Sequence, residues 1–212
     1  MNFYRSVLGQ GEAGSYTVTS VNAGGIKTIH KSSCASMFVS NSSFNSDVII
    51  GNNVSDISLM LAYCTSFNRN VVIPSGVTNC AETFRNCSSL NQNILIPNGV
   101  KNCAFMFWRC SSLNQNFVIP SSVENMYSMF INCSLGGTGC SLKINSVGRT
   151  VFNFNCAYML QGKSTSKRLN IFCNNLDALR NGNLNGVITW TSMTNGFYNS
   201  AQNIYLYNNY SG

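Results

Sequence analysis

The sequence predicts an α/β repeat solenoid in which each 23-residue unit contributes one short parallel strand and one short helical turn. Three observations carry this prediction: a 23-residue period, an aliphatic run that ends at a proline, and an apolar pattern with helical spacing behind that run. Because one such unit cannot bury its own apolar face, neighbouring units are expected to stack and share a continuous core.

The period is clearest over residues 68–135. Three consecutive units read NRNVVIPSGVTNCAETFRNCSSL, NQNILIPNGVKNCAFMFWRCSSL and NQNFVIPSSVENMYSMFINCSL, of which the last is one residue short. Residues 45–67 and 33–44 fall in the same register, and the motif NCAYML at residues 155–160 repeats NCAFMF. Regular repeats are therefore expected to run to about residue 135, with irregular repeats after it.

Each unit predicts the same two elements. The runs at residues 71–73, 94–96 and 117–119 are short, rich in β-branched residues and stopped by proline, as strands are. Behind the second run, apolar residues recur at i, i+3, i+4 and i+7, which predicts a helical turn; these are Cys103, Met106, Phe107 and Cys110. Apolar pieces at residues 142–144, 169–172 and 204–207 are predicted to be further strands.

The 212 residues favour one domain. We expect residues 1–25 to form an N-terminal docking or capping segment and residues 26–212 to form a single solenoid, whose part from 136 to 212 holds irregular repeats and a C-terminal cap. Residues 181–212 carry no charge and many aromatic residues among Asn, Ser and Gly. A cap over the last open sheet edge is the favoured interpretation of that stretch, and a recognition surface is the alternative.

The composition argues against several classes of function. Only 9% of residues are charged, and the net charge of +7 arises from scarce acidic residues and not from a basic cluster, so nucleic-acid binding is not expected. No apolar run is long enough for a signal-peptide core or a spanning helix, so membrane insertion is not expected either.

Ten cysteines raise the questions of metal binding, disulfides and catalysis. Most of them recur at 23-residue intervals in positions that other units fill with Ile, Met or Asn, which favours small core residues. Close cysteine pairs are missing and His30 is the sole histidine, so neither a zinc site nor a cysteine nucleophile with a base is indicated. We expect no metal, no obligatory disulfide, no cofactor and no enzymatic activity.

Strand alternation predicts a candidate binding surface. If residues 71 and 73 point inward, residue 72 points outward, and so do its equivalents in the other units. The outward row is then Ile49, Val72, Leu95 and Val118, with Asn70, Asn93 and Asn116 beside it. An exposed apolar row usually marks a contact surface for a partner. The alternative, which the sequence supports equally, is that a terminal segment of the chain itself covers the row.

A second set of candidate binding residues is aromatic and basic. Its members are Trp108, Arg109, Tyr205, Tyr207 and Tyr210. Trp108 occupies a variable position of the helical turn, where a binding anchor and a packing residue are equally compatible with the sequence.

The motifs IPSGV, IPNGV and IPSSV, each followed by an NCSSL-like ending, resemble those of BspA-like leucine-rich-repeat surface proteins. The resemblance covers about residues 33–135 and implies a leucine-rich-repeat-like fold without catalytic residues. Together with the weakly charged surface it favours a non-enzymatic recognition or adhesion protein that binds a host protein or glycan.

The lack of a signal-like segment favours a phage virion component, in the tail, a fibre or the capsid surface. Other virion or surface proteins are then expected partners, and a homo-oligomer such as a trimer remains open. A purely structural decoration or connector subunit, or a secreted bacterial adhesin, is the alternative.

Overall fold

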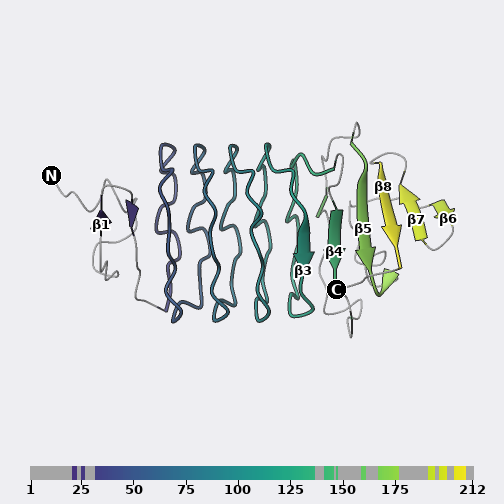
Figure 1. The fold of residues 1–212 in the computed structure, drawn as a ribbon, viewed down its shortest axis with the longest axis horizontal. Helices are drawn as coiled ribbons and strands as arrows, with labels where there is room; N and C mark the ends of the chain where they lie inside the picture. The colour runs from purple at the N-terminus through teal and green to yellow at the C-terminus, as the bar shows by residue number, and fades with distance from the viewer. Residues whose placement is uncertain are drawn as a thin grey trace.

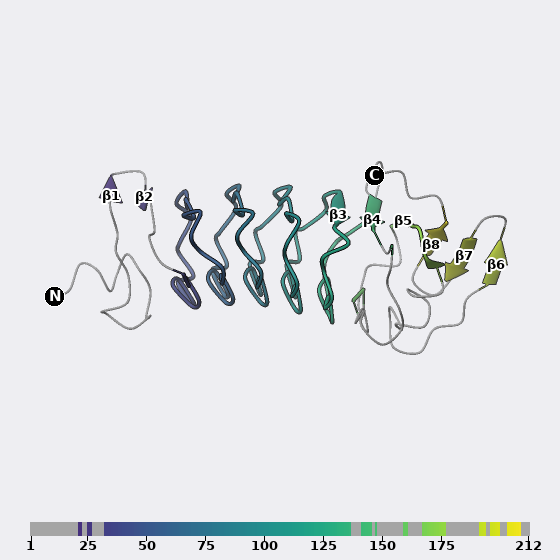
Figure 2. The ribbon, with the colours of Figure 1, turned by 90° about the horizontal axis from the view of Figure 1, so that it is seen from below.

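The computed structural model describes residues 21–22, 25–26, 32–136, 141–145, 147, 159–160, 167–176, 191–193, 196–199 and 203–208. From residue 32 the chain winds into a stack of coils, and a β-sheet continues the stack toward the C-terminal end (Figure 1). The perpendicular view shows the same coils side by side along one axis (Figure 2).

The sheet has six strands in the order β3-β4-β5-β8-β7-β6. Its first four strands are parallel: β3 (Phe117–Ile119), β4 (Ser141–Ile144), β5 (Leu169–Cys173) and β8 (Ile204–Tyr207). β7 (Gly196–Asn199) and β6 (Thr191–Met193) then pair antiparallel, and β1 (Val21–Asn22) and β2 (Gly25–Ile26) form a separate antiparallel pair. The predicted parallel sheet is confirmed, including the three predicted strands after residue 140.

The aliphatic runs before β3 are extended but mostly fall short of a strand. Residues 48–50, 71–73 and 94–96 alternate buried, exposed and buried, as β3 does. Within the described coils the only backbone bridge between these runs joins Ile49 to Val72. Regular parallel strand pairing begins only where the chain reaches β3 and β4.

A second line of contact joins the coils on their turn side. Parallel bridges link equivalent residues of successive coils: Ser33, Asp56, Asn79, Asn102 and Asn125. In each of the last four, the side-chain oxygen accepts the backbone N–H two residues ahead, at 2.9 to 3.1 Å. These Asx-type turns fix the entry into the segment for which the sequence predicts a helical turn.

That prediction of a helical turn is wrong, because residues 32–136 contain no helix. Two residues in each coil, four positions apart, have a left-handed backbone, as Phe105 (φ 55°) and Arg109 (φ 59°) do in the coil with the clearest apolar pattern. A left-handed residue costs roughly 1–2 kcal/mol and interrupts a right-handed helix. The segment is instead a run of tight turns.

Hydrogen bonds to the next coil compensate for this backbone strain. The N–H of Phe105 donates to the carbonyl of Tyr127 at 2.9 Å, and the N–H of Arg109 donates to that of Ile131 at 2.7 Å. Of the intervening N–H groups, that of Phe107 also donates to the next coil, to Met129, whereas those of Met106 and Trp108 donate within the coil. The amides of the left-handed residues therefore point along the stack. Buried side chains in these turns still recur at i, i+3, i+4 and i+7, as they would in a helix.

The core lies between the two sides of the coils. The predicted inward rows are buried, and phenylalanines form a continuous stack through them; Phe107 lies 5.5 Å from both Phe84 and Phe130, with nearly parallel rings. Cysteines fill the adjacent row, where each thiol donates to a carbonyl of the preceding coil, as Cys110 does to Phe84 at 3.0 Å. The thiols therefore pack as core residues and also link coils.

The stack continues past residue 136 with a longer unit. Phe130 donates its N–H to the carbonyl of Met159 at 2.8 Å, as Phe107 does to Met129. Met159 thus takes the position of Met129, and both Met159 and Leu160 are fully buried. The irregular repeat predicted from NCAYML is confirmed at these two residues.

Candidate binding surface

The predicted outward row of aliphatic residues faces solvent. The exposed fractions of its side chains are 51% for Ile49, 75% for Val72, 71% for Leu95 and 48% for Val118. Their sequence neighbours on both sides are buried. The strand alternation inferred from the sequence is therefore correct, and it leaves four aliphatic side chains unburied on one face, which we call the strand face.

A groove of about 650 Å³ follows this row. Val72, Leu95 and Val118 contribute its apolar part, and Asn70 and Asn93 line one side. Residues after the extended runs line the other side: Pro97, Asn98, Pro120 and Asn145. The groove thus combines an apolar floor with side-chain amides, a composition typical of sites that bind another molecule.

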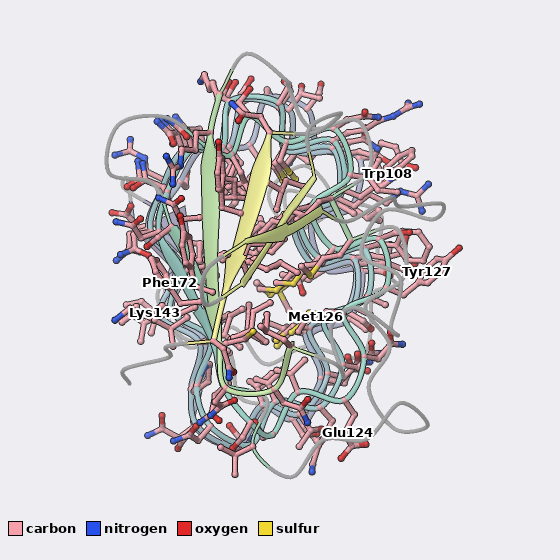
Figure 3. All side chains as sticks on the ribbon, turned by 90° about the vertical axis from the view of Figure 1, so that its right-hand side faces the viewer. Trp108, Glu124, Met126, Tyr127, Lys143 and Phe172 are labelled. Atoms are coloured by element: carbon pink, nitrogen blue, oxygen red, sulfur yellow. The ribbon has the colours of Figure 1, made fainter. Side chains whose placement is uncertain are left out.

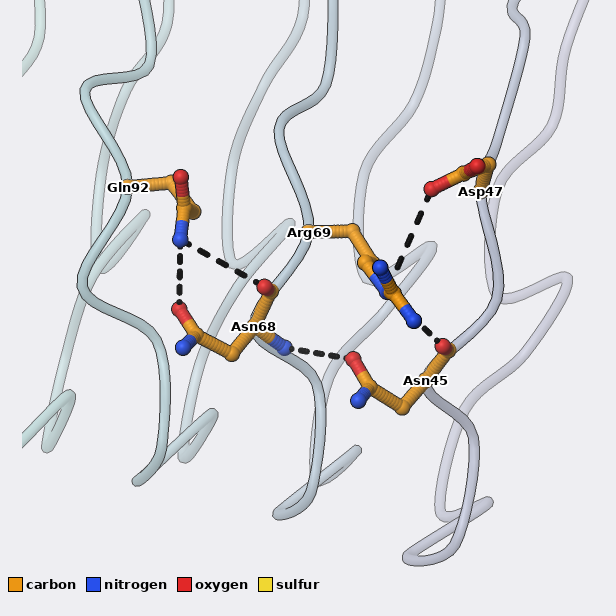
Figure 4. A network of polar contacts seen from close by, with 5 residues as sticks. All are labelled: Asn45, Asp47, Asn68, Arg69 and Gln92. Carbon is orange, nitrogen blue, oxygen red and sulfur yellow. Dashed lines mark hydrogen bonds and ion pairs between the residues drawn. The ribbon is translucent and has the colours of Figure 1, made fainter.

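Side-chain amides brace the coils next to this surface (Figure 4). The oxygen of Asn45 accepts the backbone N–H of Asn68 at 2.9 Å, and Asn68 accepts that of Asn91 at 3.0 Å. Gln92 reaches back from the next coil and donates to the side chain of Asn68, while Arg69 donates to the carbonyl of Asn45. This Asn ladder fixes the spacing between the coils that carry the outward row.

The outward row continues into the C-terminal sheet, where its chemistry changes. By register, Val118 lies beside Lys143, Lys143 beside Phe172, and Phe172 beside Tyr207. The rings of Phe172 and Tyr207 stack with centroids 5.2 Å apart. One continuous line of neighbours therefore runs from Ile49 to Tyr207, aliphatic at first and then basic and aromatic.

Arg168 is held on the same face by neutral groups. Its guanidinium lies 3.7 Å from the centroid of the Tyr205 ring and donates to the Tyr207 hydroxyl at 2.6 Å. It also donates to the Asn170 side-chain oxygen at 2.9 Å. Stacking on an aromatic face fixes the charge in place without neutralising it.

Trp108 and Arg109 lie on the other side of the molecule. In the end-on view Trp108 is on the turn side, opposite Lys143 and Phe172 (Figure 3). The guanidinium groups of Arg85 and Arg109 are 4.4 and 4.3 Å from the Trp108 ring, and Arg85 is also paired with Glu82. The half-buried Trp108 thus packs between two cations, and the structure does not join it to the strand face.

Some residues of the two candidate sets therefore lie on the same face of the molecule, and others lie on opposite sides. Tyr205 and Tyr207 share a face with the aliphatic row, whereas Tyr210 lies outside the described residues. Asn116 is exposed beside the row and accepts the backbone N–H of Ser141.

Sequence reasoning did not identify Lys143, Phe172 and Arg168 as residues of this surface. The alternation of buried and outward residues in the predicted strands could have placed Lys143 and Phe172. Arg168 depends on a contact with Tyr207, 39 residues away, for which the sequence has no signal.

The eight cysteines that the structure describes are buried. Burial raises the pKa of the Cys80 thiol to about 12, and the nearby Asp56 carboxylate adds to this effect; burial likewise raises the pKa of Cys64 to about 12. Such thiols stay protonated and are poor nucleophiles at neutral pH. Among the described residues no group of three or more His, Cys, Asp or Glu side chains could hold a metal ion, and no described helix is long and apolar enough to cross a membrane.

Comparison with known families gives one match. Residues 32–141, just over half of the chain, match the family model described as "Mycoplasma protein of unknown function, DUF285". No curated protein and no solved structure matches the chain. The matched range covers the described coils and reaches the first residue of β4.

Proposed function

Because the chain belongs to the DUF285 family, whose description assigns no activity, we propose a function from its surface: a non-enzymatic recognition protein that binds a partner molecule on the strand face. The supporting observation is the row of four aliphatic side chains that are 48–75% exposed, three of which, Val72, Leu95 and Val118, line a groove. Apolar side chains aligned in this way usually mark an interface.

The finer fold assignment is part of this proposal. Coils with a constant 23-residue offset and a parallel strand face correspond to a leucine-rich-repeat-like solenoid, here of the BspA-like type, with tight turns in place of helices. Solenoids of this kind present extended surfaces for binding. The surface amides of Asn70 and Asn93 suit hydrogen bonding to either a host protein or a glycan.

We place the protein at the surface of a particle or cell. The family description speaks of Mycoplasma proteins, which supports display on a bacterial cell. A phage virion is the second setting, because a weakly charged, Asn-rich surface also suits a virion component. Copurification of the chain with cell envelopes or with phage particles distinguishes the two.

The test of recognition is a double substitution on the strand face, Leu95→Asp with Val118→Asp. Binding of the labelled chain to a panel of bacterial and animal cells, measured by flow cytometry, is expected to fall at least tenfold. The loss follows because two carboxylates would have to be desolvated at the interface. Circular dichroism is expected to stay unchanged, since both side chains are exposed.

The matched control is Ser89→Asp with Ser112→Asp. These serines are also exposed and lie 23 residues apart, so the control adds the same charges to two neighbouring turns of the stack, away from the aliphatic row. Binding is expected to survive in the control. A chain that binds no cell type but associates tightly with a structural virion protein would instead be an assembly subunit.

A further inference from the structure

We propose that the strand face binds a protein segment that carries aliphatic side chains and, next to them, carboxylates. The aliphatic side chains lie over the row from Ile49 to Val118, and the carboxylates lie at Lys143 and Arg168. This inference rests on the proposed recognition function and specifies the chemistry of the partner.

The balance of charged residues differs between the two ends of the row. Residues 32–135 carry four basic and four acidic residues, and ion pairs join Arg69 to Asp47, Arg85 to Glu82 and Lys101 to Glu124. Residues 136–212 carry six basic residues against one acidic residue, Asp177. The charged residues that the structure describes after residue 136 are Lys143, Lys167 and Arg168, all of them basic, which favours a partner with acidic groups at the C-terminal end of the row.

Lys143 and Arg168 bring this charge onto the strand face. Lys143 is the next member of the row after Val118. The hydrogen-bond acceptors of Arg168 are the neutral oxygens of Asn170 and Tyr207. A carboxylate that reaches this end of the row would meet a guanidinium whose charge these contacts leave uncompensated, and charge-assisted hydrogen bonds are the stronger kind.

The aromatic residues argue for a protein ligand over a glycan. Sugars pack flat against an exposed aromatic face, but each ring here already has a stacking partner. Phe172 and Tyr207 stack on each other, and the guanidinium of Arg168 covers Tyr205. The adjoining aliphatic row offers no hydrogen bonds to sugar hydroxyls, whereas it does suit the aliphatic side chains of a protein.

A second copy of the chain fits this surface less well. The sequence contains six acidic residues, and Asp47, Glu82 and Glu124 are already in ion pairs. The segment before residue 32 offers a single acid, Glu12, among three basic residues. Neither occupant supplies the carboxylates that the basic end of the row attracts.

The test is selection of a random 12-residue peptide library on the immobilised full chain, in parallel with a glycan array. We expect the selected peptides to combine Leu, Ile or Val with Asp or Glu, and their affinity to fall as salt is raised. The double variant K143E/R168E is expected to bind these peptides at least tenfold more weakly. The matched charge reversal K101E/R109E, away from the strand face, is expected to leave the affinity unchanged.

The outcomes separate this inference from the proposed function. Peptides that lose binding in L95D/V118D but show no acidic preference, and no response to K143E/R168E, would overturn the acidic partner and keep the recognition surface. Binding to glycans alone would overturn the protein partner. Peptides that bind L95D/V118D as tightly as the unmodified chain would overturn both. A single variant, K143E, repeats the charge test without touching the contacts of Arg168.

Discussion

The coils of residues 32–136 and the parallel strands β4, β5 and β8 hold successive turns of the chain together by different means. In the coils, backbone bridges are isolated; backbone hydrogen bonds between tight turns join neighbours on the turn side, and side chains of asparagine, cysteine and threonine add further links. In the C-terminal sheet, strands of four or five residues pair through continuous backbone ladders. The coils are also electrically balanced, whereas the C-terminal third is basic.

This difference shows where the sequence is free to vary. A side chain that links coils must be repeated in its neighbours, which explains why the coils look alike. A sheet held by backbone hydrogen bonds leaves its outward side chains unconstrained, so Lys143, Phe172 and Tyr207 can differ from one strand to the next. The residues that would give the proposed binding surface its specificity lie in the region with the less regular sequence.

The largest expected difference in stability is between the phenylalanine stack in the core of the coils and the stack of Phe172 on Tyr207 in the C-terminal sheet. Phe107→Ala removes a fully buried ring from between Phe84 and Phe130 and is expected to cost about 3–5 kcal/mol of the free energy of unfolding. Phe172→Ala removes a partly exposed ring and is expected to cost about 1 kcal/mol. Urea unfolding of both variants measures the comparison, and equal losses would show that the two stacks contribute alike.

A smaller effect is expected from the polar links. Asn91→Ala leaves the backbone N–H of Asn114 without its side-chain acceptor and removes one of the acceptors of the Gln115 amide, and it is expected to cost about 1 kcal/mol. Asn170→Ala, in β5, removes only the acceptor for Arg168 and is expected to cost less than about 0.5 kcal/mol, because the backbone ladder is kept. Urea midpoints that rank the two in the opposite order would contradict the assigned role of the Asn ladder.

A pH-dependent effect is expected from the thiols, seven of whose eight described members lie in the coils. The folded pKa of Cys80 is raised to about 12, so its stabilising contribution is complete below the unfolded pKa near 9 and is lost as pH rises toward the folded pKa. Cys80→Ala lacks this titration. The stability difference between the unmodified chain and the variant is expected to shrink by about 1 kcal/mol from pH 8 to pH 10, as measured by urea unfolding at each pH.

The sequence predicts the features that depend on repetition and alternation. A constant interval fixes which residues become neighbours in the stack, and alternation along a strand fixes that Leu95 points outward while Ile94 and Ile96 point inward. The three C-terminal strands follow from the same reasoning.

What the sequence does not predict depends on backbone conformation and distant contacts. The apolar spacing from Cys103 to Cys110 is the same for a helix and for tight turns with left-handed residues, so the pattern alone does not distinguish them. The placement of β8 between β5 and β7 reverses the order of the last strands, and no local signal marks it. The basic end of the strand face follows from that placement, since β8 supplies the tyrosines that hold Arg168.

The constant offset of the Asn ladder has a consequence for the gene. Asn68 and Asn91 each accept the backbone N–H of the equivalent asparagine in the next coil. Because this contact is the same at each junction, the junctions between regular coils are interchangeable. Recombination that duplicates or removes one coding unit would therefore join two surfaces that already fit, and would lengthen or shorten the aliphatic row by one side chain. The reach of the binding surface can evolve in whole steps, while its charged end stays in place.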